Sequence, residues 1–385
     1  MVVKHLVAGS AALLLLLGTA PSVAAPSPVP TVTVRPSDLP VGEPLRVAVL
    51  DGRSGTVHLP TGVSVTIDDP AGDWYPDTLL EVAGGYLVSA RRGARTVVVT
   101  DDGDVRELPR RPYEPVMVAT DGRTFLGERT AHLPGRRGYR DLRRFRVSDG
   151  RPVGRPLVVP ATLDSTVPLV MTRHRVLVTA LRKPFPSQDL RTRWWNTRTG
   201  TSRPLIGAAP RQFADTLGRV ASVRGGIATS DLERRQSVVD LRTGRTLWKV
   251  GAPGRGWGRE AGVAVSPNGA HLLTVDDAGT MAGYGADFVR RLRVHDARTG
   301  TALADFSGFF DTVEDGPPNP KLTWETSDSF VAVAHDDFAD GGGSGSFTGT
   351  VAVVRCRVST GACESVPLPS VTTTYFLSLA TRASS

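Results

Sequence analysis

The stretch Val238-Val239-Asp240-Leu241-Arg242-Thr243-Gly244-Arg245-Thr246-Leu247-Trp248 predicts a strand, a tight turn and a second strand. Related turns recur between apolar runs along the chain, with their glycines at Gly55, Gly103, Gly150, Gly200, Gly244, Gly300 and Gly361. These glycines are 48, 47, 50, 44, 56 and 61 residues apart. Glycine suits such turns because it adopts positive φ without a steric penalty. The chain is therefore expected to repeat one small β unit.

One hairpin in each period of about fifty residues predicts an all-β fold, a single β-propeller of four-stranded blades. The four-strand pattern can be placed in full six times. Residues 45–60 would supply only a third and a fourth strand, and residues 373–380 a first strand with part of a second. Together the two termini would close the ring as one composite blade, which also removes free sheet edges. We expect seven blades, with six or eight as alternatives.

Residues 261–306 resemble a WD40-type blade, with Ser266-Pro267-Asn268-Gly269 at the first turn and His295-Asp296 in place of the Trp-Asp pair. The spacing of Asp240, Thr243-Gly244 and Trp248 is similar to the tryptophan-docking repeat of pyrroloquinoline-quinone dehydrogenases. That second resemblance implies a propeller enzyme with a quinone cofactor. Only one of the seven turns carries the tryptophan, so the resemblance supports the blade type more than the cofactor, and we expect no cofactor.

Residues 1–25 predict a signal peptide. Lys4 and His5 precede an apolar run at 6–17, and small residues follow, with cleavage after Ala24 or Ala25. The run is shorter than the ~20 residues of a membrane span, and no cysteine follows it that could carry a lipid anchor. We expect a secreted, extracellular, monomeric protein without a membrane span. Residues 26–42 predict a proline-rich linker, 43–381 the propeller and 382–385 a tail.

The two cysteines, Cys356 and Cys363, lie on the two arms of the last predicted hairpin. Residues opposite each other on antiparallel strands are about 4.5–5.5 Å apart at Cα, a separation that a disulfide spans. An exported chain with an even number of cysteines favours oxidation. We therefore predict a disulfide here rather than a zinc site, for which no second cysteine or histidine cluster is present.

The chain is basic, with a formal net charge of +8, and only four of its 46 basic residues are lysines. A basic surface attracts anionic polymers such as nucleic acid or cell-wall phosphates. Codon usage in a GC-rich genome would explain the arginines equally well. The arginines are scattered among acidic residues, which disfavours nucleic acid as the partner.

The two faces of the predicted propeller differ in loop length. Turns between strands one and two and between strands three and four share one face, and here they are uniformly short. All sizeable insertions belong to the opposite face, at 61–77, 130–142, 182–192, 251–260, 277–289, 308–321 and 336–349. Because function concentrates in long loops on rigid scaffolds, we predict the binding site on this face.

Two loops stand out within these insertions. Residues 129–146 contain seven arginines, whose forks suit carboxylate, sulfate or phosphate groups. Residues 335–343 form an acidic, glycine-rich segment that is a flexible loop or, alternatively, a calcium site. Phe338 interrupts the spacing of a calcium loop, so we expect no metal. The ligand-binding candidates on this face are Trp74, Tyr75, Arg136, Arg137, Tyr139, Arg140, Trp257, Asp336, Asp337 and Asp340.

No catalytic signature accompanies the fold. The chain lacks a serine flanked by glycines two residues away on both sides, and its histidines lack metal-ligand spacing. The sequence therefore favours a non-catalytic binding module that recognises a protein, a glycan or an anionic envelope polymer through the long-loop face. The alternative is a propeller enzyme, namely a quinoprotein-like dehydrogenase, a lactonase or a lyase, with its site on the axis.

Overall fold

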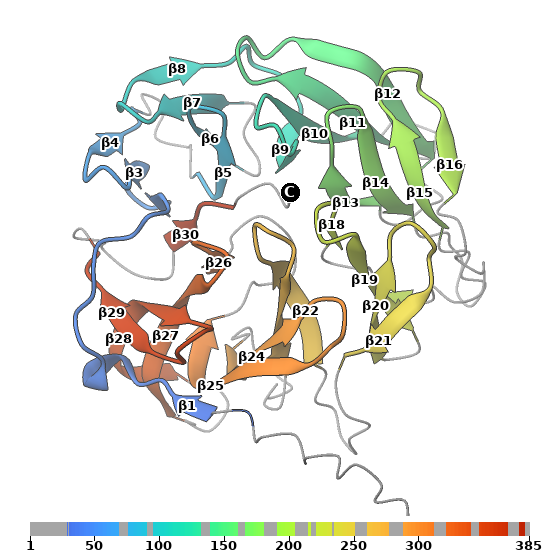
Figure 1. The fold of residues 1–385 in the computed structure, drawn as a ribbon. Helices are drawn as coiled ribbons and strands as arrows, with labels where there is room; N and C mark the ends of the chain where they lie inside the picture. The colour runs from blue at the N-terminus through green and yellow to red at the C-terminus, as the bar shows by residue number, and fades with distance from the viewer. Residues whose placement is uncertain are drawn as a thin grey trace, which may run out of the picture.

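The chain forms a ring of β-sheets around a central axis (Figure 1). The computed structural model describes residues 29, 31–68, 76–90, 95–131, 139–160, 166–180, 191–204, 215–216, 221–232, 235–250, 260–276, 288–311, 321–339, 346–368 and 377–381. No helix in these ranges is long and apolar enough to cross a membrane.

Four units are sheets of strands that follow one another in the chain, running from the axis outward. They are β5 (Thr78–Val82), β6 (Gly85–Ser89), β7 (Thr96–Thr100) and β8 (Val105–Glu107); β9 (Glu114–Val118), β10 (Thr124–Ala131), β11 (Tyr139–Arg146) and β12 (Pro152–Pro160); β13 (Thr166–Met171), β14 (Arg175–Ala180), β15 (Arg191–Asn196) and β16 (Ser202–Pro204); and β17 (Asp215–Thr216), β18 (Ala221–Ser222), β19 (Ile227–Leu232), β20 (Arg235–Asp240) and β21 (Thr246–Lys249).

Two further units belong to one continuous sheet, because Phe309 and Phe310 of β25 pair with β27. They are β22 (Glu260–Val265), β23 (His271–Asp276), β24 (Phe288–Asp296) and β25 (Ala302–Asp311), and β26 (Leu322–Trp324), β27 (Ser329–Ala339), β28 (Ser346–Arg357) and β29 (Cys363–Val366). The last unit is composite, with β30 (Leu377–Leu379) beside β2 (Val49–Asp51), β3 (Thr56–His58) and β4 (Ser64–Thr66). The described strands thus fall into seven units, the number expected of a seven-bladed ring; six have four strands, and the unit β17–β21 has five because β17 and β18 both pair with β19.

Each unit packs its two faces against its two neighbours. This explains runs such as Val97, Val98 and Val99 in β7, which are apolar without alternation and are all buried. The described core divides into seven apolar clusters, one between each pair of consecutive units. One of them joins β27–β29 to β2 and β30, so the ring is closed by packing as well as by strand pairing. The prediction of an all-β propeller is confirmed.

The composition of the composite unit corrects the expected strand register. Its N-terminal part contributes three strands rather than two, and the third, β4, lies inside the predicted loop 61–77. The Gly55 turn therefore joins strands two and three and lies on the long-loop face. Gly62, with φ +85°, takes the place between strands three and four, and its amide donates to the Leu59 carbonyl over 2.9 Å.

The other repeated glycines lie in the short turns between strands three and four, as the sequence predicts. All seven predicted turn glycines have positive φ, between 65° and 93°. In the turn between β20 and β21, Oδ1 of Asp240 accepts hydrogen bonds from the amides of Arg242 and Thr243 over 3.0 and 2.9 Å. These bonds hold the pKa of Asp240 low, at about 2, with the Thr243 amide as the largest cause and the Arg298 guanidinium next.

These turns also dock each unit onto the preceding one. Trp248 in β21 lies against Gly300 of the next unit and donates from Nε1 to the Ala297 carbonyl over 3.0 Å. Arg298 binds back to Oδ2 of Asp240 over 3.0 Å. Glycine is required at position 300 because a Cβ there would lie 2.5 Å from Cδ2 of the tryptophan. The tryptophan-docking resemblance therefore describes a contact between blades.

The same relation holds around the ring. At four other turn glycines, an added Cβ atom would lie 2.8 to 3.2 Å from the nearest atom of the preceding unit, or of the N-terminal strand that pairs with it. The pairs are Gly103 with Val63, Gly150 with Pro109, Gly200 with Arg155, and Gly361 with Val32. Closer to the axis, turns between strands one and two of neighbouring units form hydrogen bonds with each other. For example, the Ala83 amide donates to the Gly122 carbonyl over 2.9 Å. The short-turn face is thus occupied by contacts between units.

Residues 31–46, defined here as the N-terminal strap, are built into the fold. The sequence predicted a linker up to residue 42, but β1 (Thr31–Thr33) pairs in parallel with the outer edge of β25. The 3-10 helix η1 (Pro36–Asp38) follows, and the Ser37 amide donates to Oδ1 of Asp336 over 2.8 Å. The Gly42 amide then donates to the Ser365 carbonyl over 2.8 Å. The strap therefore covers the outer edges of two neighbouring units.

A buried arginine fastens the end of the strap. Arg355 in β28 is 3% exposed, and Nε and Nη2 bind both oxygens of Glu325 over 2.5 and 2.8 Å. Nη1 reaches Glu364 and the Glu43 carbonyl over 2.5 and 3.1 Å, and Nη2 reaches the Pro44 carbonyl over 2.8 Å. A guanidinium has five N–H donors, so each has an acceptor.

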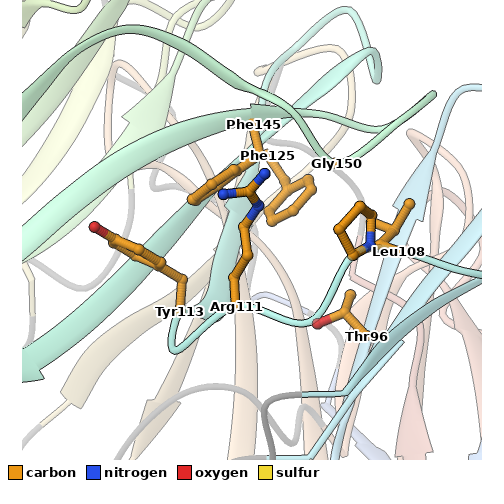
Figure 2. A pocket seen from close by; sticks show the side chains of 8 residues that line it. Thr96, Leu108, Arg111, Tyr113, Phe125, Phe145 and Gly150 are labelled. Carbon is orange, nitrogen blue, oxygen red and sulfur yellow. The ribbon is translucent and has the colours of Figure 1, made fainter.

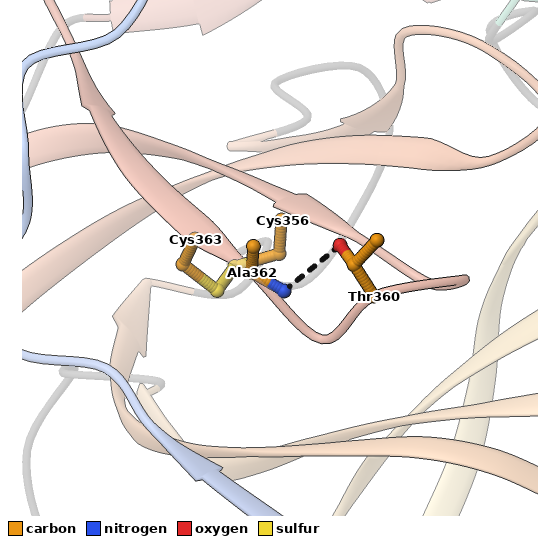
Figure 3. The surroundings of a disulfide bond; sticks show 4 residues. All are labelled: Cys356, Thr360, Ala362 and Cys363. Carbon is orange, nitrogen blue, oxygen red and sulfur yellow. Dashed lines mark hydrogen bonds between the residues drawn. A yellow bond between two sulfur atoms is a disulfide. The ribbon is translucent and has the colours of Figure 1, made fainter.

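The predicted disulfide is confirmed on the hairpin of β28 and β29. Cys356 and Cys363 are directly opposite in the register, with their Cα atoms 4.2 Å apart. Figure 3 shows the bond beside the turn, where the Ala362 amide donates to Oγ1 of Thr360 over 3.2 Å. The disulfide closes this turn near the strap.

Replacing Arg355 by methionine should lower the free energy of unfolding by about 3–5 kcal/mol, because the charge of the buried Glu325 would lose the guanidinium that neutralises it. Arg46→Ala is the control, since its side chain is 61% exposed and forms its ion pair with the exposed Glu43. That change should cost less than about 1 kcal/mol. Urea unfolding of both variants measures the difference; equal costs would show that the buried pair does not fasten the strap.

Gly300→Ala should destabilise the protein more than Gly84→Ala. Both glycines have nearly the same φ, +75° and +78°, but nothing lies within 4 Å of a Cβ at Gly84. The shared cost of positive φ is roughly 1–2 kcal/mol, and the clash with Trp248 should add about 1–3 kcal/mol at Gly300. Thermal and urea unfolding of the two variants compare these costs. If they are the same, glycine serves the turn alone and not the docking of units.

Candidate functional site

Most of the predicted ligand-binding residues lie outside the described ranges. These are Trp74, Tyr75, Arg136, Arg137, Trp257 and Asp340. Tyr139 and Arg140 open β11, where their backbones pair with Ala131 and Thr130, and their side chains lie outside the description. They remain predictions.

The acidic segment is in part a strand and not a loop. Asp336 and Asp337 lie in β27, which pairs with β28 up to Ala339. Oδ1 of Asp336 accepts from the Ser37 amide and Oδ2 from the Thr350 amide, both over 2.8 Å. Partial burial raises the pKa of Asp336, but these two amides outweigh it and lower the pKa overall. Its carboxylate thus holds the strap. The described residues contain no group of three or more His, Cys, Asp or Glu side chains suited to a metal.

An arginine–aromatic cluster lies between the units β5–β8 and β9–β12. We define it as Arg111, Tyr113, Arg129, Asp141 and Arg143. The β10–β11 register places Gly127 opposite Arg143 and Arg129 opposite Asp141. Because side chains alternate along a strand, these residues share one face of the sheet with Phe125 and Phe145. Tyr113 joins them from the connection that precedes β9, and Arg111 from two residues earlier.

Aromatic rings form the base of the cluster. Phe125 stacks on Phe145 with ring centroids 5.3 Å apart, and Tyr113 meets Phe145 edge-on at 5.1 Å. Gly127 permits this approach, since a Cβ there would lie 2.8 Å from Cε2 of Phe145 and 2.9 Å from Cβ of Tyr113. Figure 2 shows the guanidinium of Arg111 beside the two phenylalanine rings. The rings thus give the arginines a rigid support.

Three guanidiniums stand over these rings. Cζ of Arg129 and Cζ of Arg143 are 5.0 and 5.7 Å from the centroid of Tyr113, and Cζ of Arg111 is 5.8 Å from that of Phe145. At these separations the ring quadrupole attracts a cation. Arg129 and Asp141 lie toward the end of β10 and β11 that carries the long loop, whereas Arg143 lies near the middle of the strand and Arg111 lines a hollow that also contains Gly150.

One buried carboxylate balances part of this charge. Asp141 is 2% exposed, and its Oδ2 accepts from the Tyr113 hydroxyl over 2.5 Å and from Nη2 of Arg129 over 3.0 Å. Burial is the largest cause that raises the pKa of Tyr113, to about 12, and the bond to Asp141 adds to it. The tyrosine therefore stays protonated and acts as a hydrogen-bond donor.

The space between the rings and Arg111 is small. The hollow lined by Thr96, Leu108, Phe125, Phe145 and Gly150 leaves about 10 Å³, room for roughly one water molecule. A ligand of the cluster would consequently lie on its outer surface, over the guanidiniums, and would not be enclosed.

None of the five cluster residues is among the predicted ligand-binding residues, although the sequence singled out the stretch that contains three of them. The arginine-rich stretch 129–146 includes Arg129 and Arg143, and period-two alternation separates them from Arg144, which is 5% exposed and hydrogen-bonds to Thr124 and Thr197. Arg111 was not among the predicted site residues. It comes from a connection whose position relative to β11 depends on how the two units pack, and no local pattern shows that.

No protein-family model and no curated protein sequence matches the chain. Among solved structures, TolB from Acinetobacter baumannii is similar with a TM-score of 0.42 and 12% identity, covering 85% of this chain and 78% of that one. BamB from Moraxella catarrhalis has a TM-score of 0.41 and 12% identity, covering 89% and 86%. Apo AztD from Citrobacter koseri has a TM-score of 0.42 and 11% identity, covering 85% of each. Nothing about the ligand of this chain follows from these similarities.

Proposed function

We propose that the protein is a non-catalytic binding module that holds its partner on the long-loop face. The observation that carries the proposal is the difference between the two faces. Turns on the short-turn face are engaged in docking one unit onto the next, as Trp248 on Gly300 illustrates. The arginine–aromatic cluster supports the opposite face, because Arg129 and Asp141 lie toward the ends of β10 and β11 that carry a long loop.

The strands support the same choice of face. The two longest described strands, β27 with 11 residues and β28 with 12, form a hairpin that ends on the long-loop face. β24 and β25, with 9 and 10 residues, reach the same face. Paired strands carry loops on a stiffer base than irregular chain does, which reduces the entropy lost when a partner binds.

We also propose that the protein acts outside the cytoplasm. The disulfide Cys356–Cys363 supports this, because disulfides persist in oxidising compartments. The signal peptide predicted at residues 1–25 lies outside the described residues. Intact-mass measurement of the protein from the producing cells should find an N-terminus at Ala25 or Pro26. A full-length mass, with Met1 retained, would contradict export through this signal.

Attaching a bulky group to one face should separate the roles of the two faces. Arg110→Cys, in the connection between β8 and β9, and Arg245→Cys, in the short turn between β20 and β21, both replace exposed arginines. Both native cysteines are in the disulfide, so a maleimide polyethylene glycol of about 5 kDa should label only the new thiol.

We expect the label at position 110 to weaken binding to washed envelope fractions of the producing cells at least tenfold, and the label at position 245 to leave binding within twofold. Sedimentation of the labelled protein with the envelopes measures both. Loss of binding only with the label at 245 would place the partner on the short-turn face and overturn the proposal, as would binding that neither label changes.

A further inference from the structure

We propose that the arginine–aromatic cluster binds phosphate groups of an anionic polymer, with Arg111 and Arg143 as the anion-binding side chains. This inference rests on the proposed function and names the ligand chemistry of the same face. Three observations carry it: the charge balance of the cluster, the partial burial of its guanidiniums and the small size of the hollow beneath them.

The charge balance leaves two arginines unmatched. Asp141 is already engaged by Arg129 and Tyr113. Within the described ranges, Arg111 and Arg143 make ring contacts but no ion pair. Glu128 alternates with Gly127 and Arg129 in β10 and therefore belongs to the other face of the sheet. A ligand that neutralises the cluster must supply about two negative charges.

Phosphate supplies that charge better than a single carboxylate does. A phosphate monoester carries about −1.5 to −2 at neutral pH, and neighbouring phosphodiesters carry one charge each. Guanidinium groups donate two parallel N–H bonds to phosphate oxygens, and such charge-assisted bonds are stronger than neutral ones. Two arginines on separate elements can hold two oxygens or two successive groups.

Partial burial makes these arginines effective anion ligands. The Nε atoms of Arg111 and Arg143 are buried and have no hydrogen-bond partner in the described part of the chain. Both guanidiniums are held against rings, so less side-chain entropy is lost when an anion binds. Low local dielectric also strengthens the attraction between the guanidinium and an incoming charge.

The size of the hollow decides between a polymer and a small molecule. Sites for small ligands usually enclose most of the ligand surface. Here about 10 Å³ remains beneath Arg111, so a phosphate group must bind at the rim with its remainder outside. A chain of phosphates satisfies this arrangement, because one of its groups can contact the two arginines while the rest of the chain stays outside the hollow.

The test measures binding of two probes by calorimetry in about 20 mM salt: poly(glycerol phosphate) and inorganic phosphate. The test variant is Arg111→Gln/Arg143→Gln. The control, Arg242→Gln/Arg245→Gln, removes the same charge from two exposed arginines of the turn between β20 and β21, away from the cluster. We expect the test variant to bind the polymer at least tenfold more weakly than the unchanged protein, and the control to remain within twofold. Circular dichroism and thermal unfolding verify that both variants fold.

Three results would overturn the inference. Equal weakening in the two double variants would mean that net charge alone attracts the polymer. Inorganic phosphate bound as tightly as the polymer, per phosphate, would identify a free anion as the ligand. Absence of polymer binding by the unchanged protein would exclude the ligand class. The proposed function would survive that last result if the label at position 110 still blocked binding to envelopes, so the two failures can be told apart.

Discussion

The hydrogen bonds of the Arg355 guanidinium are the interaction that ties the N-terminal strap to the closed ring. Buried guanidiniums are costly unless every donor is bonded, and here two glutamates and two backbone carbonyls meet all five N–H groups. Two of those acceptors belong to the strap, at Glu43 and Pro44. Arg355 in β28 thus holds the end of the strap beside the unit β26–β29. The chain then continues into β2, which pairs with β30.

Docking between units explains why the repeated turn has its composition. Asp240 caps its own turn with Oδ1 and binds Arg298 of the next unit with Oδ2. Glycine at the end of the turn serves both positive φ and close approach, since Trp248 lies against Gly300. A motif that repeats for this reason marks the face that holds the ring together. The surface that we propose for a partner lies at the other ends of the strands.

Local chemistry made much of this fold predictable from sequence. Turn glycines, the hairpin period and the opposed cysteines follow from properties of a few neighbouring residues, and the structure agrees with them. The register of the composite unit did not follow, because Gly55 and Gly62 both suit a turn and only pairing with β30 distinguishes them. Residues 26–42 are predicted as a linker because of their prolines, and no sequence pattern indicates the three-residue strand β1 within them. Of the cluster, the sequence singled out only the arginine-rich stretch 129–146. Alternation in β11 is a local pattern, whereas the approach of Arg111 depends on packing between units.

Hydrogen–deuterium exchange of the strap tests the central claim, that the N-terminal segment is part of the closed ring. The amides of Val34, Gly42 and Arg46 donate to Ser307, Ser365 and Glu325 over 2.7, 2.8 and 2.7 Å. Peptides covering residues 31–46 should therefore exchange as slowly as those of β28 and β29, and lose protection together with them as denaturant is added. Exchange of residues 31–46 at the rate of unstructured chain, with β28 and β29 still protected, would contradict the account.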